Sequence, residues 1–455
     1  MKHLFKSIFF TLIIINWASA LNADNGFFQI GYGSEARSLG GAGAATTRDA
    51  IGGAINPAST AWVGDHLDLG LLVSTGVTDL ERKAGLNGLL DANLRSERAT
   101  DALAEFGFSK KISEDSTLGI IGYSNGTSTV YPGTSNICPV PPPAAPGELK
   151  LGNVDCGDGQ LASNYKQFTL APTYSIKFLE TFSLGISVLA IGTSFETTGE
   201  QGLASVSSDK RNLSNRGFDY SFGVGTRIGG LWKVSKYLSL GAAWSPKTRM
   251  TNFDRYRGLI SDRGRLDTPE NYSIGFEISP FEFISFVGDF QKLKYGEVNA
   301  LANPGYSPIT QIQFGNPGGP GRGWQNMDVF KVGIRLVPIE NLRVSFGASW
   351  NTAAFEPSNT SINLASPATG RRHFTGGIGY SFSEGSEFSI YFSEQVKEKI
   401  EGLSGLATNI ATQINGTPTL TGYESIATQQ QSLGFQYSTK ITYADSTNAS
   451  ESSSD

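Results

Sequence analysis

Two histidines, His66 and His373, are the residues outside the N-terminal leader best suited to general acid–base catalysis near neutral pH. They fall near the starts of two expected strands that run in opposite directions, so an apolar band about 25 Å tall separates them. No Gly-x-Ser-x-Gly motif, metal-ligand cluster or phosphate-binding loop accompanies either one. We therefore expect no enzymatic activity, no metal site and no cofactor, and interpret both histidines as interfacial polar residues.

Two cations, Lys331 and Arg335, are candidates for binding a carboxylate. Both alternate with apolar residues along an expected strand, so they point to the opposite face from those residues. Two interpretations remain open. The cations could belong to a charge ladder that pairs the strands with the N-terminal hatch expected at residues 21–64 and with solvent, or one of them could meet a substrate carboxylate at the polar end of an apolar pocket. Other charged residues with the same expected orientation are Arg227, Arg343, Lys440, Asp219, Glu277 and Asp289.

The only two cysteines, Cys138 and Cys156, lie in one expected long loop. Because a secreted chain passes into an oxidising compartment, we predict that they form a disulfide. In the chain-entropy model, closing a loop of this length stabilises the fold by roughly 3 kcal/mol. Metal binding is disfavoured, since structural zinc sites normally use four ligands.

The N-terminal residues indicate secretion. Lys2 and Lys6 precede an apolar stretch, and Ala18-Ser19-Ala20 matches a cleavage site, so residues 1–20 are predicted to be a signal peptide. No other apolar run is long enough to span a bilayer as a helix. Removing the two lysines changes the formal net charge from −5 to −7. A mildly acidic chain without a basic cluster disfavours a nucleic-acid partner.

The elements that position these residues are expected to be strands, because apolar residues alternate with small or polar ones along residues 65–443. In the last segment, Leu433, Phe435 and Tyr437 share one face, whereas Gly434 and Gln436 lie on the other. An all-β transmembrane antiparallel barrel requires this pattern, with apolar side chains toward lipid. Fourteen strands are expected, at residues 66–76, 103–112, 116–126, 165–178, 182–195, 217–232, 238–250, 269–279, 283–295, 327–337, 342–352, 372–383, 387–399 and 430–443.

The connections between these strands alternate in length. Short turns face the periplasm and long loops face the exterior in bacterial outer-membrane barrels. The chain is accordingly expected in the outer membrane of a Gram-negative bacterium, with the barrel at 65–443 and a periplasmic tail at 444–455. The chain contains 55 glycines and 28 phenylalanines, yet only 39% of its residues are hydrophobic. This composition suits strands that each have one apolar face and one face of small or polar residues.

A barrel of this size needs something in its lumen. About eight strands are filled by their own side chains, whereas about 16 to 18 leave a water channel, so fourteen would leak. Residues 21–64 precede the first strand and are rich in glycine and alanine. Within them, Pro57 holds Asn56 extended, so Asn56-Pro57-Ala58 is predicted to form a fixed turn. We expect residues 21–64 to form a hatch inside the lumen.

At these residues the chain resembles the FadL/TodX family of outer-membrane transporters for long-chain fatty acids and other hydrophobic compounds. The resemblance rests on Gly26-Phe27-Phe28-Gln29, on Leu39-Gly40 with a following small-residue run, on Asp49-Ala50 before Asn56-Pro57-Ala58, and on the strand number. It covers essentially the whole mature chain. One departure is Gly41, where the family commonly has a basic residue.

The resemblance implies passive uptake of a long-chain fatty acid or another hydrophobic small molecule by a monomer surrounded by outer-membrane lipid. It also implies a gating hatch, with Phe27 and Phe28 near the substrate pocket, and sideways release through the third strand. A structural or adhesive barrel whose loops bind a partner is the alternative, distinguished by whether an apolar pocket lies between hatch and wall. A polar-solute porin is disfavoured by the expected hatch.

The third strand is the expected exit. Residues 118–123 lack the regular alternation of apolar and polar residues seen in the other strands. At Gly122 a bend in the strand would cost little free energy. A strand with two apolar faces, packed on the hatch, explains the same residues. The family resemblance implies instead an inward kink that opens the wall at Gly122.

Overall fold

The structure is a computed structural model, and it describes residues 25–84, 88, 90–133, 136–139, 149–305, 312–383, 385–417 and 419–441. The expected signal peptide, 1–20, and the expected tail, 444–455, lie outside the described residues. Within the described ranges, no helix combines the length and the apolar character needed to cross a bilayer.

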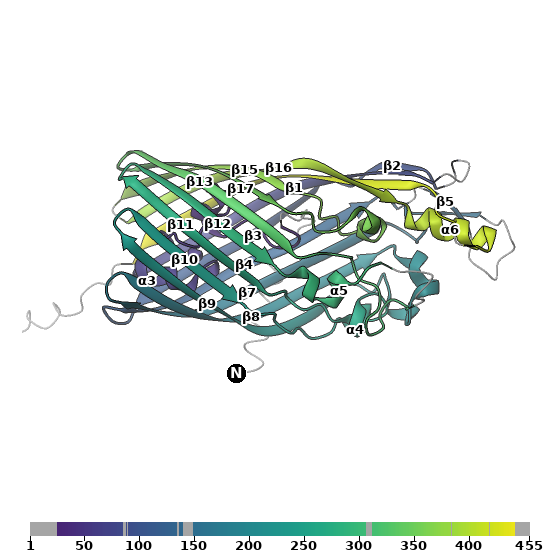
Figure 1. Cartoon of the computed structure of the whole chain (residues 1–455), viewed down its shortest axis with the longest axis horizontal. Coiled ribbons are helices and arrows are strands. Elements are labelled where there is room, and N and C mark those ends of the chain that lie inside the picture. Colours follow the sequence, from purple (N-terminus) through teal and green to yellow (C-terminus); the bar gives the residue numbers. More distant parts are fainter. Residues whose placement is uncertain are drawn as a thin grey trace, which may run out of the picture.

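Fourteen antiparallel strands form a closed barrel, as the alternation predicted (Figure 1). The last strand closes the barrel by pairing with the first, from His66↔Lys440 to Lys83↔Tyr423. The barrel strands are β1 His66–Lys83, β3 Ala99–Lys111, β4 Ser116–Tyr131, β7 Leu161–Phe178, β8 Phe182–Thr198, β9 Asp219–Ser235, β10 Leu238–Ser245, β11 Asn271–Phe281, β12 Ile284–Leu293, β13 Met327–Ile339, β14 Leu342–Asn351, β15 Arg372–Ser383, β16 Ser386–Leu403 and β17 Tyr423–Lys440.

The period-two pattern explains which face each side chain occupies. In β17, Leu433 and Tyr437 are exposed on the outside, while Ser432, Gln436 and Ser438 are buried toward the lumen. The same separation repeats around the wall and leaves a wide apolar outer surface, which a protein tolerates only against lipid or a partner. Members of this outer apolar band include Leu69, Leu71, Ile186, Val188, Phe276, Ile334, Phe346, Ile390 and Leu433.

The two ends of the barrel differ. Turns such as the one between β13 and β14 are short and lie at one end, whereas long connections lie at the other (Figure 1). Several strands, among them β1, β16 and β17, continue past their expected limits toward the long-loop end, because their ladders extend where the apolar alternation stops. The elements there are β2 Ala92–Arg95, β5 Asn136–Pro139, β6 Leu149–Gly152, η3 Gln201–Val206, η4 Lys210–Asn212, η5 Asp254–Tyr256, α4 Ser261–Gly264, η6 Tyr295–Glu297, α5 Asn299–Ala302, η7 Pro357–Asn359, η8 Ser361–Asn363 and α6 Gly405–Asn415.

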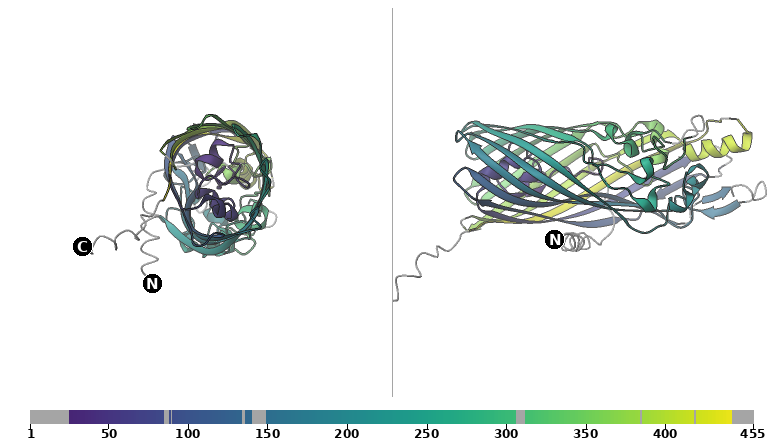
Figure 2. Two further views of the ribbon diagram at one scale, coloured as in Figure 1. Left: turned by 90° about the vertical axis from the view of Figure 1, so that its left-hand side faces the viewer. Right: turned by 90° about the horizontal axis from the view of Figure 1, so that it is seen from below.

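Residues 25–64, the N-terminal segment, lie inside the barrel (Figure 2, left). Almost all of them are buried. The segment contains only short helices, α2 Gly33–Ser38, η1 Ile51–Ala54, η2 Pro57–Ser59 and α3 Thr60–Val63. Its small residues give it little core of its own, so the barrel wall supplies the packing partners.

Candidate functional site

Glycines on the inner face of the wall let the N-terminal segment pack backbone against backbone. A Cβ atom added at Gly241, for example, would come closer than 3.0 Å to the carbonyl oxygen of Ala44, and one at Gly347 would overlap Gly40. We call these positions the inner glycine ring. Its members are Gly107, Gly185, Gly229, Gly241, Gly333, Gly347 and Gly377, contributed by β3, β8, β9, β10, β13, β14 and β15.

The expected Asn56-Pro57-Ala58 turn sits on this ring. The side-chain amide of Asn56 donates to the carbonyl oxygens of Ala44 (2.7 Å) and Gly230 (3.0 Å), and its Oδ1 accepts from the Ala58 N–H (3.1 Å). Asn56 is extended, with φ −134° and ψ 107°, as a residue before proline prefers. The turn therefore holds the segment to β9 through a side chain that is fully satisfied.

Buried charges hold the same segment. Glu35 forms ion pairs with Arg335 and, at 2.9 Å, with Arg343. Burial alone would raise the pKa of Glu35, but Arg335, Arg343 and Arg48 outweigh it and lower this pKa from 4.5 to about 2. Glu35 is therefore ionised at neutral pH.

Lys331 and Arg335, the predicted carboxylate-binding cations, both face the N-terminal segment. The ammonium group of Lys331 donates to the carbonyl oxygens of Ile30 (2.8 Å) and Gly41 (3.3 Å). Arg335 binds Glu35 and Glu277. These contacts are those of the charge-ladder interpretation, and a substrate carboxylate would have to displace them. The carboxylate-binding role stays a prediction.

Phe27 and Phe28 enter a group of aromatic rings that we call the aromatic cluster. The Phe27 ring centroid lies 4.9 Å from that of Tyr165, 5.3 Å from that of Tyr295 and 6.2 Å from that of Trp324. All five side chains are buried and belong to a larger apolar core that continues into the long connections. Sequence reasoning missed Tyr165, Tyr295 and Trp324 as site residues, because distant parts of the chain contribute them.

The wall is interrupted beside this cluster. β3 pairs with β4 only from Phe106↔Gly122 to Lys111↔Thr117, although β4 pairs with β7 along its whole length, Ser116–Tyr131. Beyond Gly122 the two strands separate, and we call this gap the β3–β4 seam. The Phe106 ring lies directly over Gly122, where a Cβ atom would not fit.

The N-terminal segment takes the place of β3 along this part of β4. The Gly126 N–H donates to the carbonyl oxygen of Phe27 (3.2 Å), and the Asn125 side chain accepts from the Tyr32 hydroxyl (2.6 Å) and from the Gln29 N–H (3.3 Å). Most of the residues in which the sequence loses its alternation, 118–122, are still paired with β3, and the two strands separate only beyond them.

The two histidines, interpreted from the sequence as interfacial polar residues, lie apart from the seam. His66 contacts Asp68 at 3.2 Å, and His373 lies near Ser349 at 3.4 Å, each facing the lumen at opposite ends of the wall. Among the residues that the structure describes, no group of three or more His, Cys, Asp or Glu could hold a metal ion.

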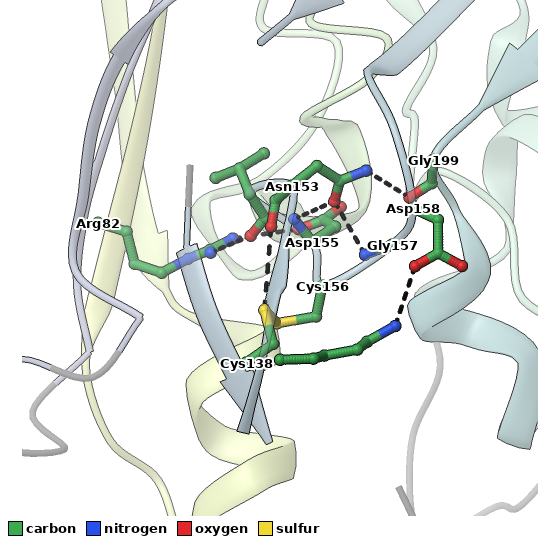
Figure 3. Close-up of a disulfide and its surroundings, with 10 residues drawn as sticks. Arg82, Cys138, Asn153, Asp155, Cys156, Gly157, Asp158 and Gly199 are labelled. Atoms are coloured by element: carbon green, nitrogen blue, oxygen red, sulfur yellow. Dashed lines mark hydrogen bonds and ion pairs between the residues drawn. A yellow bond between two sulfur atoms is a disulfide. The ribbon is translucent and has the colours of Figure 1, made fainter. Parts of the chain in front are cut away.

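Cys138 and Cys156 are joined by a disulfide in a long connection, with their Cα atoms 5.6 Å apart (Figure 3). Asn153, next to this bridge, accepts hydrogen bonds from Asp155 N–H (2.9 Å) and Gly157 N–H (3.0 Å). Arg82 of β1 binds Asp155 at 3.1 Å, so the bridged loop is fastened to the rim of the barrel.

Comparison with known proteins identifies the same architecture elsewhere. No protein-family model and no curated protein sequence matches the chain. Among solved structures, the P. putida toluene transporter TodX is similar, with a TM-score of 0.64 and 16% identity over 91% of this chain and 100% of that one. The Ralstonia pickettii toluene transporter TbuX matches with a TM-score of 0.59 and 14% identity, over 91% and 99% of the two chains.

A Pseudomonas aeruginosa FadL homologue matches with a TM-score of 0.61 and 13% identity, over 93% of this chain and 100% of that one. Identities this low establish shared architecture and nothing finer. The resemblance read from the N-terminal motifs is therefore confirmed in the fold: this chain has the fourteen-stranded barrel fold of TodX, TbuX and the FadL homologue.

Proposed function

We propose that this protein is an outer-membrane channel of a Gram-negative bacterium for the passive uptake of hydrophobic small molecules, either long-chain fatty acids or aromatic hydrocarbons. The protein acts as a monomer in lipid and uses no cofactor or energy source. The N-terminal segment is its hatch, and substrate leaves sideways through the β3–β4 seam. The single observation that carries this proposal is that Phe27 contributes its ring to the aromatic cluster and its carbonyl oxygen to Gly126 at the seam.

The aromatic cluster lies between the long connections and the β3–β4 seam, so it is placed to control the passage of substrate from one to the other. Substrate that enters among the apolar side chains of the long connections would next meet Phe27 and Phe28. Because hatch and β4 are joined by few hydrogen bonds there, displacement of these two rings would also loosen the Gly126 contact. Binding at the cluster would thereby be coupled to opening of the seam. Substrate binding at the aromatic cluster and substrate release through the seam would then occur together.

Uptake of labelled toluene and of oleate, measured in cells that express the protein, tests the function. Replacing both hatch rings, with Phe27→Ala and Phe28→Ala, should reduce the uptake of the transported compound several-fold. Phe374→Ala removes a ring of the outer apolar band and is the matched control, because Phe374 is exposed to lipid. Uptake no faster than in cells without the protein, for both compounds, would contradict the proposal and favour an adhesive or structural role.

Lateral release is tested separately by closing the seam. Phe106 and Gly122 are paired in register at the start of the seam, and the Phe106 side chain lies against the position of a Cβ atom at Gly122, so Phe106→Cys with Gly122→Cys places two thiols opposite each other. Oxidation of this pair should block uptake and leave substrate binding intact, and reduction should restore uptake. Wild-type protein treated with the same reductant controls for loss of the Cys138–Cys156 bridge. Unchanged uptake in the fully oxidised variant would rule out this exit.

A further inference from the structure

Few contacts close the β3–β4 seam. Beyond the Phe106↔Gly122 pair, the Ser124 hydroxyl donates to the carbonyl oxygen of Ala104 at 3.4 Å, and at the far end the Glu97 N–H donates to the carbonyl oxygen of Val130 at 2.8 Å. Between Gly122 and Val130 the outer face of β4 carries only small residues, and they are buried: Gly122, Ser124, Gly126 and Ser128. A buried outer face of small residues means that the edge of β3 overlaps β4 instead of pairing with it.

An ion pair crosses this overlap. The ammonium group of Lys166 on β7 lies 3.0 Å from Oδ2 and 3.3 Å from Oδ1 of Asp101 on β3. Lys166 is paired in register with Gly126, so β4 lies between the two charged residues in the order of strands. The absence of a side chain at Gly126 leaves room for the lysine to reach across.

The orientation of the two side chains shows that this contact depends on the seam. Asp101 belongs to the inner face of β3, with Leu103 and Glu105, whereas Lys166 lies between the lumen-facing Tyr165 and Gln167 and so points outward. In a continuous sheet, residues of opposite faces point away from each other and cannot pair. They meet here only because β4 has moved inward and β3 covers it.

We infer that the Asp101–Lys166 ion pair is the latch that keeps the β3–β4 seam closed until substrate displaces the hatch. This inference rests on the proposed function, since it names what regulates the proposed exit. The Asp101 side chain is 1% exposed and that of Lys166 is 14% exposed, so each charge is largely removed from water. When the pair breaks, each charge stays poorly solvated until the seam has widened enough to admit water. The closed state is therefore lower in free energy than a partly opened one, and the seam closes again once substrate has left.

The test measures the width of the seam without using any substrate. The thiol pair Phe106→Cys and Gly122→Cys, at the start of the seam, reports closure through its rate of disulfide formation under a mild oxidant. Adding Lys166→Met should slow this reaction roughly tenfold, corresponding to about 1.4 kcal/mol, and should raise toluene or oleate uptake when the thiols are absent. Exchanging the charges, with Asp101→Lys and Lys166→Asp, should restore both rates toward those of the parent.

Lys292→Met is the matched control, because Lys292 pairs with Asp328 at 2.8 Å between strands whose ladder is intact. Lys292→Met should change neither the rate of disulfide formation nor the rate of uptake. Crosslinking that is unaffected by Lys166→Met would overturn the latch, and so would a charge-exchanged variant that crosslinks as slowly as the single variant. If wild-type protein transports neither compound, the proposed function fails, while the crosslinking rates still decide whether the ion pair holds the seam.

Discussion

At the scale of single residues, the absence of a side chain decides how the N-terminal segment is held. The inner glycine ring lets the segment approach the wall to backbone distance, and Glu35 then binds arginines of β13 and β14. The two devices act on the same segment: the glycines allow its close approach to the wall, and the buried carboxylate of Glu35 binds Arg335 and Arg343 there.

Gly241→Ala is expected to loosen the segment. The new methyl group would overlap the carbonyl oxygen of Ala44, which is backbone and cannot rotate away, so we expect about 1–3 kcal/mol of destabilisation. Thermal unfolding in detergent and protease cleavage within residues 25–64 measure the effect. Gly376→Ala is the control, because a Cβ atom there would make only ordinary contacts at 3.6 Å and beyond. Equal stability of the two variants would contradict tight seating at Gly241.

Glu35→Gln is expected to destabilise the protein in a pH-dependent way. The pKa of Glu35 is lowered from 4.5 to about 2 in the folded state, so its contribution to stability is present above pH 4.5 and is lost as the pH falls through about 2. The difference in unfolding temperature between wild type and Glu35→Gln should be largest near neutral pH and shrink across this range. A difference that stays constant down to pH 2 would show that the charge of Glu35 is unimportant.

At the scale of elements, the N-terminal segment depends on the barrel more than the barrel depends on it. The segment contains only short helices, and its largest buried contacts are with strands. The barrel ladder, in contrast, closes through β1 and β17 without any contribution from the segment. Removing the segment should therefore spare the wall and empty the lumen.

A variant lacking residues 22–58 is expected to fold into an open pore. Its conductance in planar lipid bilayers should exceed that of the intact protein, because water and ions would replace the buried segment in a lumen of fourteen strands. Selective uptake of hydrophobic compounds should be lost in the same variant. If the truncated barrel conducts no more ions than the intact one, the hatch assignment is wrong.

At the scale of the whole molecule, the outer apolar band and the asymmetry of the two ends define an orientation in the membrane. The band is exposed on the outside of the barrel, the short turns lie at one end, and α6 lies at the other (Figure 1). Long connections face the exterior in outer-membrane barrels. We therefore expect α6 and the disulfide-bridged loop to lie outside the cell, and the turn between β13 and β14 to lie in the periplasm.

Epitope insertion tests this orientation. An epitope placed after Asn415, at the end of α6, should be labelled by antibody on intact cells. An epitope placed between Glu340 and Asn341 should be labelled only after the outer membrane is permeabilised. The opposite pattern would invert the topology, and labelling of neither site after permeabilisation would argue against insertion of the folded barrel.

The sequence alone determined the parts of this protein that are encoded locally. Leu433, Phe435 and Tyr437 face outward because alternate residues of any strand lie on opposite faces, and the same rule yields fourteen strands and their short turns. Strand ends were predicted less well. β1 extends to Lys83, since pairing with β17 continues where the apolar signal has ended.

Only the tertiary structure decided what the lumen-facing residues contact. The sequence left two roles open for Lys331, whose partner Ile30 is 301 residues away. Tyr165 and Tyr295 meet Phe27 from separate parts of the barrel, and Lys166 meets Asp101 only because β3 overlaps β4. Such contacts depend on barrel closure and strand overlap, and these are properties of the whole sheet that no local pattern of residues encodes.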